Sequence, residues 1–394
     1  MAGPLDGVLV ADFSRVLAGP LCTVNLADLG ATVIKVERPG TGDDTRTWGP
    51  PWSPHGATYF ESVNRSKLSV TLDLKHAADR TLAVRLATRA DVLVENHRPG
   101  ALDRLGLGYE QVKALNPGIV YCSITGFGAA GGADLLGYDF VVQAMGGLMS
   151  ITGDPDGQPT KAGVALVDVL AGKDATIGVL AALAARDHSG HGGRVEINLL
   201  SSLLGSLVNQ AQGFLETGVA PERMGNRHPS IAPYETLRCQ DGLLAVACGN
   251  DGQFVRLAAV IGSPELSSDE RFVTNTGRVA HRDELVAALE SALQTHDAAT
   301  WATRLTAAQV PAGKVGTIAD GFALAERLGL APTVDVGPGH TRQVRQAITF
   351  TPELVAGPTP PPDLGADSAG LRGWLAGPPG STLSTNHSTE GVPT

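Results

Sequence analysis

The chain contains few of the residues that build disulfide frameworks, metal sites or membrane spans. Its 394 residues include only four cysteines, and no two of them form a C-x-x-C pair. We therefore expect neither a zinc site nor a disulfide scaffold, and scattered thiols suit a reducing cytoplasm. The amino-terminal residues lack a basic segment and a long apolar one, so no signal peptide is expected. The longest apolar-rich stretch, 177–185, is too short to cross a bilayer. A soluble, cytoplasmic protein is the expectation.

Positive charge is also scarce. Lys and Arg total 30 against 40 Asp and Glu, which gives a formal net charge of −10 at pH 7. Such a chain has no overall attraction to nucleic acid or to an anionic membrane, so neither is expected as a partner. Any ligand that carries phosphate must therefore be held by local basic residues. The composition, 43% hydrophobic and 18% charged, is that of an ordinary globular protein.

Short apolar runs alternate with stretches of helical periodicity in the first third of the chain. This order predicts an α/β domain with a mostly parallel sheet. The expected strands are 7–13, 31–37, 68–74, 91–96 and 118–127, with helices at 20–30, 79–90 and 101–116. Further along, we expect helices at 170–187 and 199–217, a hairpin at 237–251, and helices at 252–262, 281–294 and 298–308.

The first strand, turn and helix, followed by a strand that ends in Glu37, also fit the start of a dinucleotide-binding domain. In such a domain the acidic residue holds a ribose. The turn here reads SRVLAGPLC, without a G-x-G-x-x-G pattern and with a proline where the backbone would approach the pyrophosphate. The sequence therefore argues against a nicotinamide-dependent enzyme.

One carboxylate, Asp168, lies within the small and apolar segment AGVALVDVLAG, residues 162–172. Burying an ionised carboxylate without a partner is costly, so a purely structural core would avoid it. A structural interpretation makes Asp168 the N-cap of a helix that begins near Leu170. A catalytic interpretation makes it a nucleophile, since partial desolvation and fixed placement turn a carboxylate into a covalent catalyst.

Six ordered segments resemble the class III CoA-transferase family, which is also called CaiB/BaiF or formyl-CoA-transferase-like. The resemblance covers nearly the whole chain and stops near the tail. The segments are LAGPLCTVNLADLGATVIKVERPGTGDDTR (17–46), NRSKLSVTLDLK (64–75), VLVENHRPGALDRLGL (92–107), GYDFVVQAMGGLMSITG (137–153), GVALVDVLAG (163–172) and SGHGGRVEINLLSSLL (189–204).

The resemblance implies a CoA-dependent acyl chemistry in which Asp168 is the nucleophile. Attack on an acyl-CoA thioester gives a mixed anhydride and releases the CoA thiolate. The thiolate then attacks the aspartyl carbonyl, which frees the first acid and leaves Asp168 carrying CoA as a thioester. An incoming acid reverses these steps. The implied substrates are an acyl-CoA and a carboxylic acid, with no metal and no permanently bound cofactor.

CoA needs cations for its phosphates and apolar walls for its adenine, and a planar guanidinium suits phosphate well. By position in the family motifs, the expected CoA-binding residues are Arg38, Leu72, Lys75, Asn96, His97, Arg104, Tyr138 and Asp139. Two positions depart from the pattern. His97 replaces an aromatic residue of some relatives, and Leu17 stands where formyl-CoA transferase has a glutamine, so that polar contact is not carried over.

The tripeptide at Tyr138 separates two branches of the family. Relatives that racemise 2-methylacyl-CoA carry GHD, in which the histidine is a base, whereas this chain has GYD. An unperturbed tyrosine has a pKa of about 10 and is a poor base near neutral pH, so transfer is favoured over racemisation. Tyr138 then packs against CoA or donates a hydrogen bond near Asp168, unless it is simply a core residue.

The second half resembles the branch that contains succinyl-CoA:glutarate and other dicarboxylate CoA-transferases. The similar segments are GNRHPSIAPYETL (225–237) and VACGNDGQF (246–254). The expected substrate and lid residues are Arg227, His228, Tyr234, Gly249, Asn250 and Gln253. Arg227 would pair with a distal carboxylate, and the second segment would close over the thioester. Alternatively, that segment is an ordinary hairpin-to-helix turn with Asp251 as N-cap.

The resemblance also implies a domain plan: a Rossmann-like large domain built from both ends of the chain, a smaller α+β domain and an interlinked homodimer. The expected ranges are 1–218 for the first part of the large domain, 225–325 for the small domain, 326–380 for the return, and 381–394 for a disordered polar tail. Two rival functions remain open, a 2-methylacyl-CoA racemase or epimerase and a CoA-binding protein without transfer activity.

Overall fold

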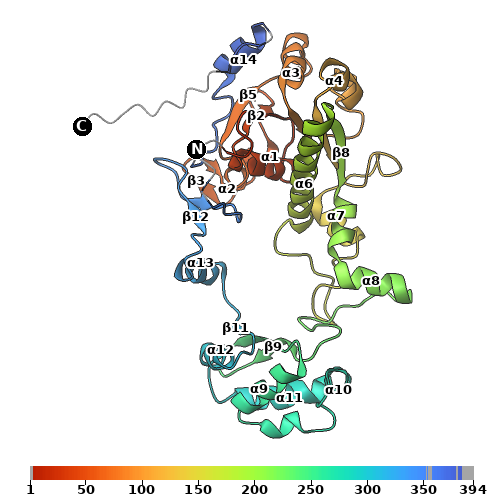
Figure 1. Ribbon diagram of the computed structural model, residues 1–394, viewed down its shortest axis with the longest axis vertical. Coiled ribbons are helices and arrows are strands. Elements are labelled where there is room, and N and C mark those ends of the chain that lie inside the picture. The colour runs from red at the N-terminus through yellow and green to blue at the C-terminus, as the bar shows by residue number, and fades with distance from the viewer. Residues whose placement is uncertain (1–2, 352, 354–356, 379, 384–394) are drawn as a thin grey trace, which may run out of the picture. The chain divides into compact units, whose positions relative to one another are not determined.

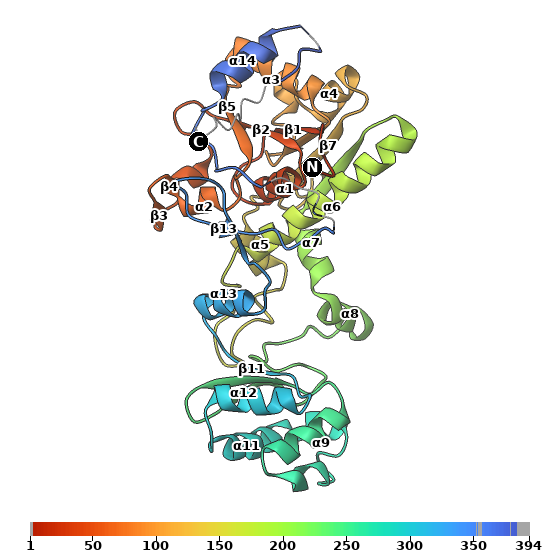
Figure 2. The same ribbon diagram turned by 60° about the vertical axis from the view of Figure 1, so that its left-hand side comes forward.

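Two compact units make up the structure, a computed structural model that describes residues 3–351, 353, 357–378 and 380–383 (Figures 1 and 2). The first unit comprises 1–146, 163–212 and 331–394, and the second comprises 147–162 and 213–330. Residues 147–162 thus interrupt the range expected for the large domain. They join the second unit because Gly225 N–H donates to the Gly153 carbonyl at 3.0 Å and the Arg223 side chain donates to the Asp154 carbonyl at 3.1 Å.

A six-stranded sheet in the order β5-β2-β1-β6-β7-β8 forms the centre of the first unit, and every neighbouring pair is parallel. The strands are β1 (Leu9–Asp12), β2 (Thr32–Glu37), β5 (Lys67–Thr71), β6 (Val92–Glu95), β7 (Val120–Thr125) and β8 (Gly193–Asn198). Five of them fall on predicted strands, so the predicted α/β class with a parallel sheet is confirmed. β8 was not predicted, because Val195 and Ile197 are the only large apolar residues of its segment GRVEIN.

Helices cover both faces of this sheet, with α3, α4 and α14 on one face and α1 and α6 on the other (Figures 1 and 2). The pairing register aligns Ala11, Ile34, Leu93 and Tyr121 in one row, and this row packs in the core beneath α3, α4 and α14. Burial on both faces explains why the central strands are continuous apolar runs. The helices are α1 (Ala18–Asp28), α2 (Thr58–Glu61), α3 (Ala77–Arg89), α4 (Tyr109–Leu115), α5 (Asp139–Met145), α6 (Leu166–Ser189), α7 (Leu199–Ser206) and α14 (Ser368–Ala376).

Shorter elements complete the first unit. They are the 3-10 helices η1 (Asp44–Thr47) and η2 (Asp103–Leu105), the pair β3 (Trp52–Ser53) and β4 (Gly56–Ala57), and the pair β12 (Thr333–Val334) and β13 (Gln343–Val344). α8 (Val208–Thr217) crosses the boundary between the two ranges. Of the tail expected to be disordered, 384–394 lies outside the described residues, whereas Ser381 accepts a hydrogen bond from the Trp374 indole and Leu383 packs against the core.

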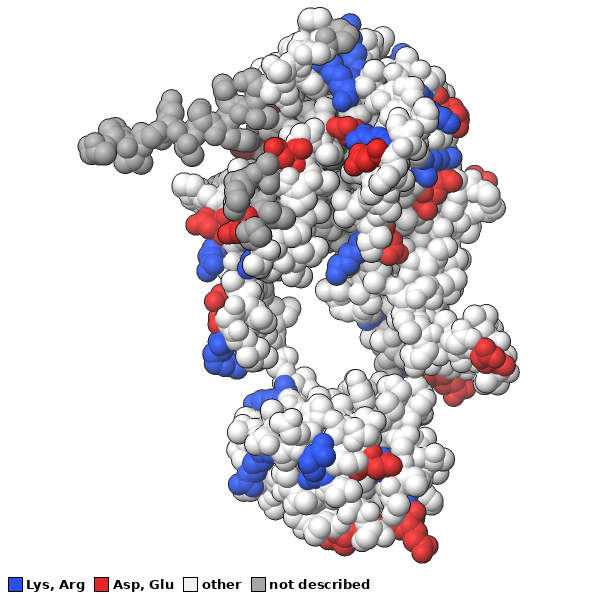
Figure 3. All heavy atoms as spheres, in the orientation of Figure 1, with Lys and Arg blue, Asp and Glu red and all other residues white. Residues whose placement is uncertain are grey.

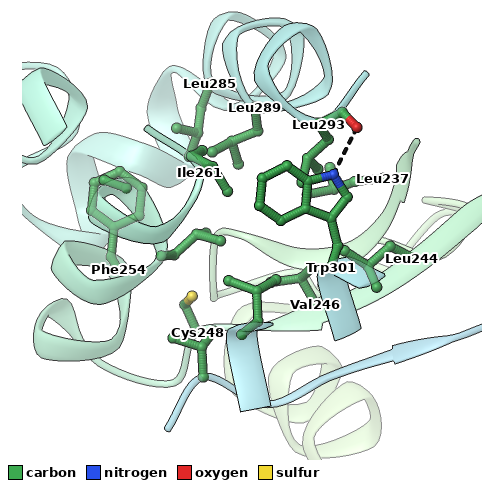
Figure 4. Packing of buried hydrophobic residues seen from close by; sticks show 14 of the residues in the cluster. Leu237, Leu244, Val246, Cys248, Phe254, Ile261, Leu285, Leu289, Leu293 and Trp301 are labelled. Atoms are coloured by element: carbon green, nitrogen blue, oxygen red, sulfur yellow. Dashed lines mark hydrogen bonds between the residues drawn. The ribbon is translucent and has the colours of Figure 1, made fainter. Parts of the chain in front are cut away.

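A separate core holds the second unit together. Three antiparallel strands, β9 (Tyr234–Arg238), β10 (Leu243–Ala247) and β11 (Ala312–Lys314), pack against helices whose apolar residues recur at helical spacing. Trp301 lies at the centre, and its indole N–H donates to the Leu293 carbonyl at 2.8 Å (Figure 4). The helices are α9 (Asp251–Val260), η3 (Pro264–Ser267), α10 (Asn275–Ala280), α11 (Arg282–Leu293), α12 (Ala298–Ala307) and α13 (Ile318–Arg327). The predicted hairpin and the three helices that follow it are confirmed.

Acidic and basic side chains are interspersed on the face that Figure 3 shows. In the part of the chain that the structure describes, no helix is long and apolar enough to span a bilayer.

α1 and α6 lie close together at a glycine. A Cβ built on Gly172 would fall 2.7 Å from the Ala18 carbonyl oxygen and 3.1 Å from the Leu21 Cβ. The Asn25 side chain also donates to the Thr176 hydroxyl at 3.2 Å, which ties the two helices together. α6 begins at Leu166 after Ala165, which gives no side-chain cap, so the prediction of Asp168 as N-cap near Leu170 is wrong. Asp168 is instead the third residue of the helix.

We expect Gly172→Ala to destabilise the first unit by about 1–3 kcal/mol, because the new methyl group meets backbone and α6 must shift. The matched control is Gly205→Ala in α7, where nothing lies within 4 Å of the added Cβ. There the better helix propensity of alanine leaves stability unchanged or slightly higher. Urea unfolding of both variants measures the difference, and equal midpoints would contradict the close approach.

Candidate active site

A cleft of about 260 Å³ opens at the carboxyl ends of β1, β6 and β7. The strand order reverses between β1 and β6, and parallel α/β sheets bind ligands at such a switch point. The cleft is lined by Arg15, Val16, Leu17 and Ala18 after β1, by Asn96, His97, Arg98 and Pro99 after β6, by Ile124, Thr125, Gly126, Gly128, Gly132, Ala133, Leu135, Leu136, Gly137 and Tyr138 from β7 onward, and by Asp168 and Leu199. All of these residues belong to the first unit.

Asp168 reaches the cleft from the first turn of α6. Burial raises the pKa of its carboxyl, and the nearby charge of Asp139 raises it further, to about 7. No basic side chain is among the causes of this shift. The carboxylate is therefore ionised in a large fraction of molecules near neutral pH while it remains poorly solvated, which is the condition that favours nucleophilic attack.

Asp139 positions that first turn. Its Oδ1 accepts hydrogen bonds from the Val167 N–H at 2.7 Å and the Asp168 N–H at 3.3 Å, and its Oδ2 accepts one from the Gln143 amide at 2.6 Å. A carboxylate at a helix N-terminus is favourable because it satisfies free N–H groups and complements the helix dipole. Asp139 is only 8% exposed and does not line the cleft, and its direct contact with CoA stays a prediction.

Tyrosines flank Asp168 in two different ways. Tyr138 lines the cleft and is 61% exposed, which excludes the interpretation of it as a core residue. Tyr59 is partly buried and packs edge-on against Trp48, with ring centroids 5.5 Å apart. Burial, followed by the charges of Asp168 and Asp139, raises the pKa of Tyr59 to about 12. Its hydroxyl thus stays protonated beside the acidic pair, a neighbour that the sequence motifs did not identify.

The segment after β6 forms one wall of the cleft. The Asn96 side chain accepts a hydrogen bond from the Arg15 N–H at 3.0 Å and donates one to the Arg15 carbonyl at 2.7 Å. The Nε2 of His97 lies 3.0 Å from the Phe13 carbonyl, which can only accept, so Nε2 carries a proton. Burial and then the charge of Arg15 lower the pKa of His97, so the ring is neutral and its Nδ1 is an acceptor. Asn96 and His97 therefore join the segment after β6 to the segment after β1, on the two sides of the switch point.

The expected phosphate-binding cations lie outside the cleft. Arg38 is exposed and forms an ion pair with Asp44. Lys75 is exposed on the loop before α3, and Arg104 is exposed in η2. Leu72 is 1% exposed within the core and does not line the cleft, and its contact with CoA stays a prediction. Its buried position follows from its place directly after β5, where it packs beneath the helices.

Two cations that the motifs did not identify line the cleft instead. Arg15 is paired with Asp44 at 3.0 Å, and Arg98 is exposed. The signal for both was available, because each follows the carboxyl end of a central strand within a few residues. Using it requires the strand order, which the sequence patterns do not specify.

A glycine-rich segment, 126–137, forms a further wall. The backbones of Gly126 and Gly137 approach so closely that a Cβ on Gly126 would fall 2.5 Å from the Gly137 Cα. This contact closes the segment into a loop that carries the half-exposed Leu135 and Leu136 on the cleft. The spacing of glycines between the strand and GYD was its sequence signal.

The expected substrate and lid residues belong to the second unit, and their side chains have structural partners. Arg227 pairs with Glu235 at 3.4 Å and with Asp283 at 2.8 Å. His228 and Tyr234 form a ring pair with centroids 5.1 Å apart. Gly249 N–H donates to the Gln253 side chain at 2.7 Å, and Asn250 caps α9 by accepting from the Gln253 N–H at 3.0 Å. The N-cap is therefore Asn250 and not Asp251, which pairs with Arg278.

Metal ligation has no counterpart in this geometry: among the described residues, no group of three His, Cys, Asp or Glu side chains is arranged to hold an ion.

Known proteins share this architecture and sequence. The model of CoA-transferase family III matches residues 5–368. The chain is 45% identical to the succinate–glutarate CoA-transferase of Agrobacterium fabrum over 327 residues, 81% of this chain and 82% of the relative. It is 45% identical to the acetyl-CoA:oxalate CoA-transferase of Acetobacter aceti over 320 residues, again 81% and 82% of the two chains.

A solved CaiB/BaiF family protein from Brucella suis superposes with a TM-score of 0.86 at 43% identity, covering 95% of this chain and 100% of that one. The matches extend across both units and include the cleft. The chain therefore belongs to CoA-transferase family III, the CaiB/BaiF family, and is a class III CoA-transferase that moves CoA between an acyl-CoA and a carboxylic acid.

Proposed function

We propose that this enzyme transfers CoA from succinyl-CoA, or a similar donor, to a carboxylic acid through a thioester formed on Asp168. The observation that carries the proposal is the position of this carboxylate, which reaches the cleft without a basic partner among the causes of its raised pKa. A structural carboxylate is normally paired when it is buried. No such partner is among the causes of the Asp168 shift, so its carboxylate is available for attack.

Each step of the proposed cycle uses the same side chain. An Asp168 oxygen attacks the thioester carbonyl, the C–S bond breaks, and a mixed anhydride forms as the CoA thiolate leaves. The thiolate attacks the aspartyl carbonyl, the C–O bond breaks, and the first acid departs as a carboxylate. The acceptor carboxylate then attacks the aspartyl thioester, and the sequence runs in reverse. No net proton is taken up or released, so a general base is not needed.

The cleft supplies groups that suit a CoA thioester. Arg15 and Arg98 bring positive charge to it, and Leu135 and Leu136 offer half-exposed apolar surface. Guanidinium groups bind phosphate oxygens through paired hydrogen bonds, and apolar surface suits the pantetheine chain. The names of the relatives favour dicarboxylic acids as substrates, since succinate–glutarate and oxalate transferases are among them.

We also propose a homodimer, which the apolar surfaces of α8 and α13 support. α13 has no buried residue, and Ile318 is 84% exposed on it. Leu328 and Leu330, which follow the end of α13, are each 63% exposed, and Leu215 on α8 is 73% exposed. Clusters of exposed apolar residues mark interaction surfaces on soluble proteins.

The four cysteines are free and buried, which suits the proposed cytoplasmic location.

Asp168→Asn is expected to abolish transfer, because an amide cannot form the anhydride or the thioester. The measurement incubates the enzyme with succinyl-CoA and a panel of mono- and dicarboxylates and identifies new thioesters by mass. Hydroxylamine added after succinyl-CoA should modify Asp168 in the wild-type enzyme. The matched control is Asp174→Asn, an exposed carboxylate six residues further along the same helix, which should leave the rate unchanged. A fully active Asp168→Asn enzyme would exclude this function.

The raised pKa of Asp168 makes activity and stability respond to pH in opposite directions. Activity should rise with pH up to about 7 and then level off as the carboxylate ionises. Because the folded-state pKa lies above the unfolded value, ionisation destabilises the native state, so this group's contribution falls as pH rises from 3.8 to about 7. Asp168→Asn should therefore melt at a higher temperature than wild type at about pH 8 but not at about pH 4. A melting difference independent of pH would contradict the assignment.

Ile318→Glu is expected to weaken the proposed dimer, since a charge on α13 would be buried at the interface. Sedimentation of the wild-type protein should give the mass of two chains, and the variant should dissociate at a higher protein concentration. Glu326→Gln, a charge change on the same helix, is the control. A wild-type protein that sediments as one chain rejects the dimer.

A further inference from the structure

The turn between β1 and α1 has an unfavourable backbone conformation at the edge of the cleft. Val16 has a φ of +69°, a region that branched side chains rarely adopt. Leu17 is the N-cap of α1 and Ala18 is its first residue, and both also line the cleft. No side chain caps this end of α1. Such a conformation persists only where the surrounding structure imposes it, and these cases cluster at functional sites.

A buried carboxylate imposes the conformation of Val16. Both oxygens of Asp43 accept from the Val16 N–H, at 3.2 and 3.3 Å. Thr45 fixes the same carboxylate through its N–H at 3.0 Å and its hydroxyl at 2.8 Å. The Asp43 side chain is 1% exposed, so water does not compete for these contacts.

A buried lysine completes the arrangement. Lys35 pairs with Asp43 at 2.9 Å, with its own side chain 1% exposed, and donates to the Ser14 carbonyl at 3.0 Å. The pair therefore holds the backbone on both sides of Arg15. Burial opposes ionisation of Asp43, yet Lys35 lowers the pKa of this carboxyl to about 2, so the anchor is charged at any working pH.

We propose that Asp43 and Lys35 are positioning residues, which hold the Val16 turn so that Leu17 and Ala18 face the CoA thioester opposite Asp168. This inference rests on the proposed function of the cleft. Neither Asp43 nor Lys35 lines the cleft, so they act through the turn and not through contact with the substrate. Errors of about 1 Å in such a wall cost up to about a hundredfold in rate.

The molecule contains a buried ion pair that serves as a control. Arg65 pairs with Asp28 at 2.5 Å, with side chains 8% and 7% exposed, and neither residue lines the cleft. Asp28→Glu and Asp43→Glu both keep the charge opposite their partner while they displace the carboxylate by one methylene. Each should fold, with a similar loss in melting temperature. Only Asp43→Glu moves a carboxylate that accepts a hydrogen bond from the backbone of a cleft-lining residue, Val16.

The decisive comparison uses Val16→Gly, because glycine adopts a φ of +69° without strain. We expect Asp43→Glu to lower kcat/KM for succinyl-CoA and to weaken CoA binding by about tenfold. Adding Val16→Gly should recover about threefold or more of each loss, although the melting temperature stays low. Asp28→Glu should remain near wild type in both readouts, and Val16→Gly alone gives the baseline against which the double variant is compared.

Two outcomes overturn the proposal. The first is that Asp43→Glu and Asp28→Glu change CoA affinity equally, and the second is that Val16→Gly restores nothing. CoA affinity is measured by calorimetry and does not depend on turnover. If hydroxylamine finds no adduct on Asp168 in the wild-type enzyme, the proposed function fails, while the affinity comparison still decides whether Asp43 positions the turn.

Discussion

The contact between Asp139 and the first turn of α6 brings two acidic side chains to one helix start. The Asp139 carboxylate accepts the Val167 and Asp168 N–H groups, and this places Asp168 at the cleft. The same contact sets a negative charge beside a poorly solvated carboxyl, so positioning and the raised pKa share one cause. Gly172 then lets α6 lie against α1, whose first residues form the opposite wall.

Much of the sheet follows from the sequence because its central strands are buried on both faces. Val10, Val33 and Val92 are fully or almost fully buried, so their runs are apolar throughout and stand out from the flanking helices. β8 was not predicted because this edge strand carries only two large apolar residues, Val195 and Ile197, which are too few to stand out. The order of the strands is a long-range property, and no local pattern encodes it.

The residues of the candidate site that the sequence predicted are those that belong to a family motif. Asp168, Asn96, His97 and Tyr138 were named from motifs, and the structure brings all four to one cleft. Leu72 packs in the core and does not line the cleft, so its contact with CoA stays a prediction. Arg98 was missed because its position after β6 points to the cleft only once the strand order is known. The positive φ of Val16 could not be foreseen, since valine is among the residues least typical of that region.

Buried carboxylates near the cleft are of two kinds, those paired with a lysine and one that has no basic partner among the causes of its pKa shift. Asp12 and Asp43 are fully buried but paired with Lys67 and Lys35, and their pKa values fall below the ordinary range. Asp168 has no such partner, and its pKa rises. Paired carboxylates fix backbone because their charge is satisfied, whereas an unsatisfied one remains reactive. A lysine placed beside Asp168 would stabilise the fold, but it would also lower the pKa of the carboxyl and make the carboxylate a weaker nucleophile.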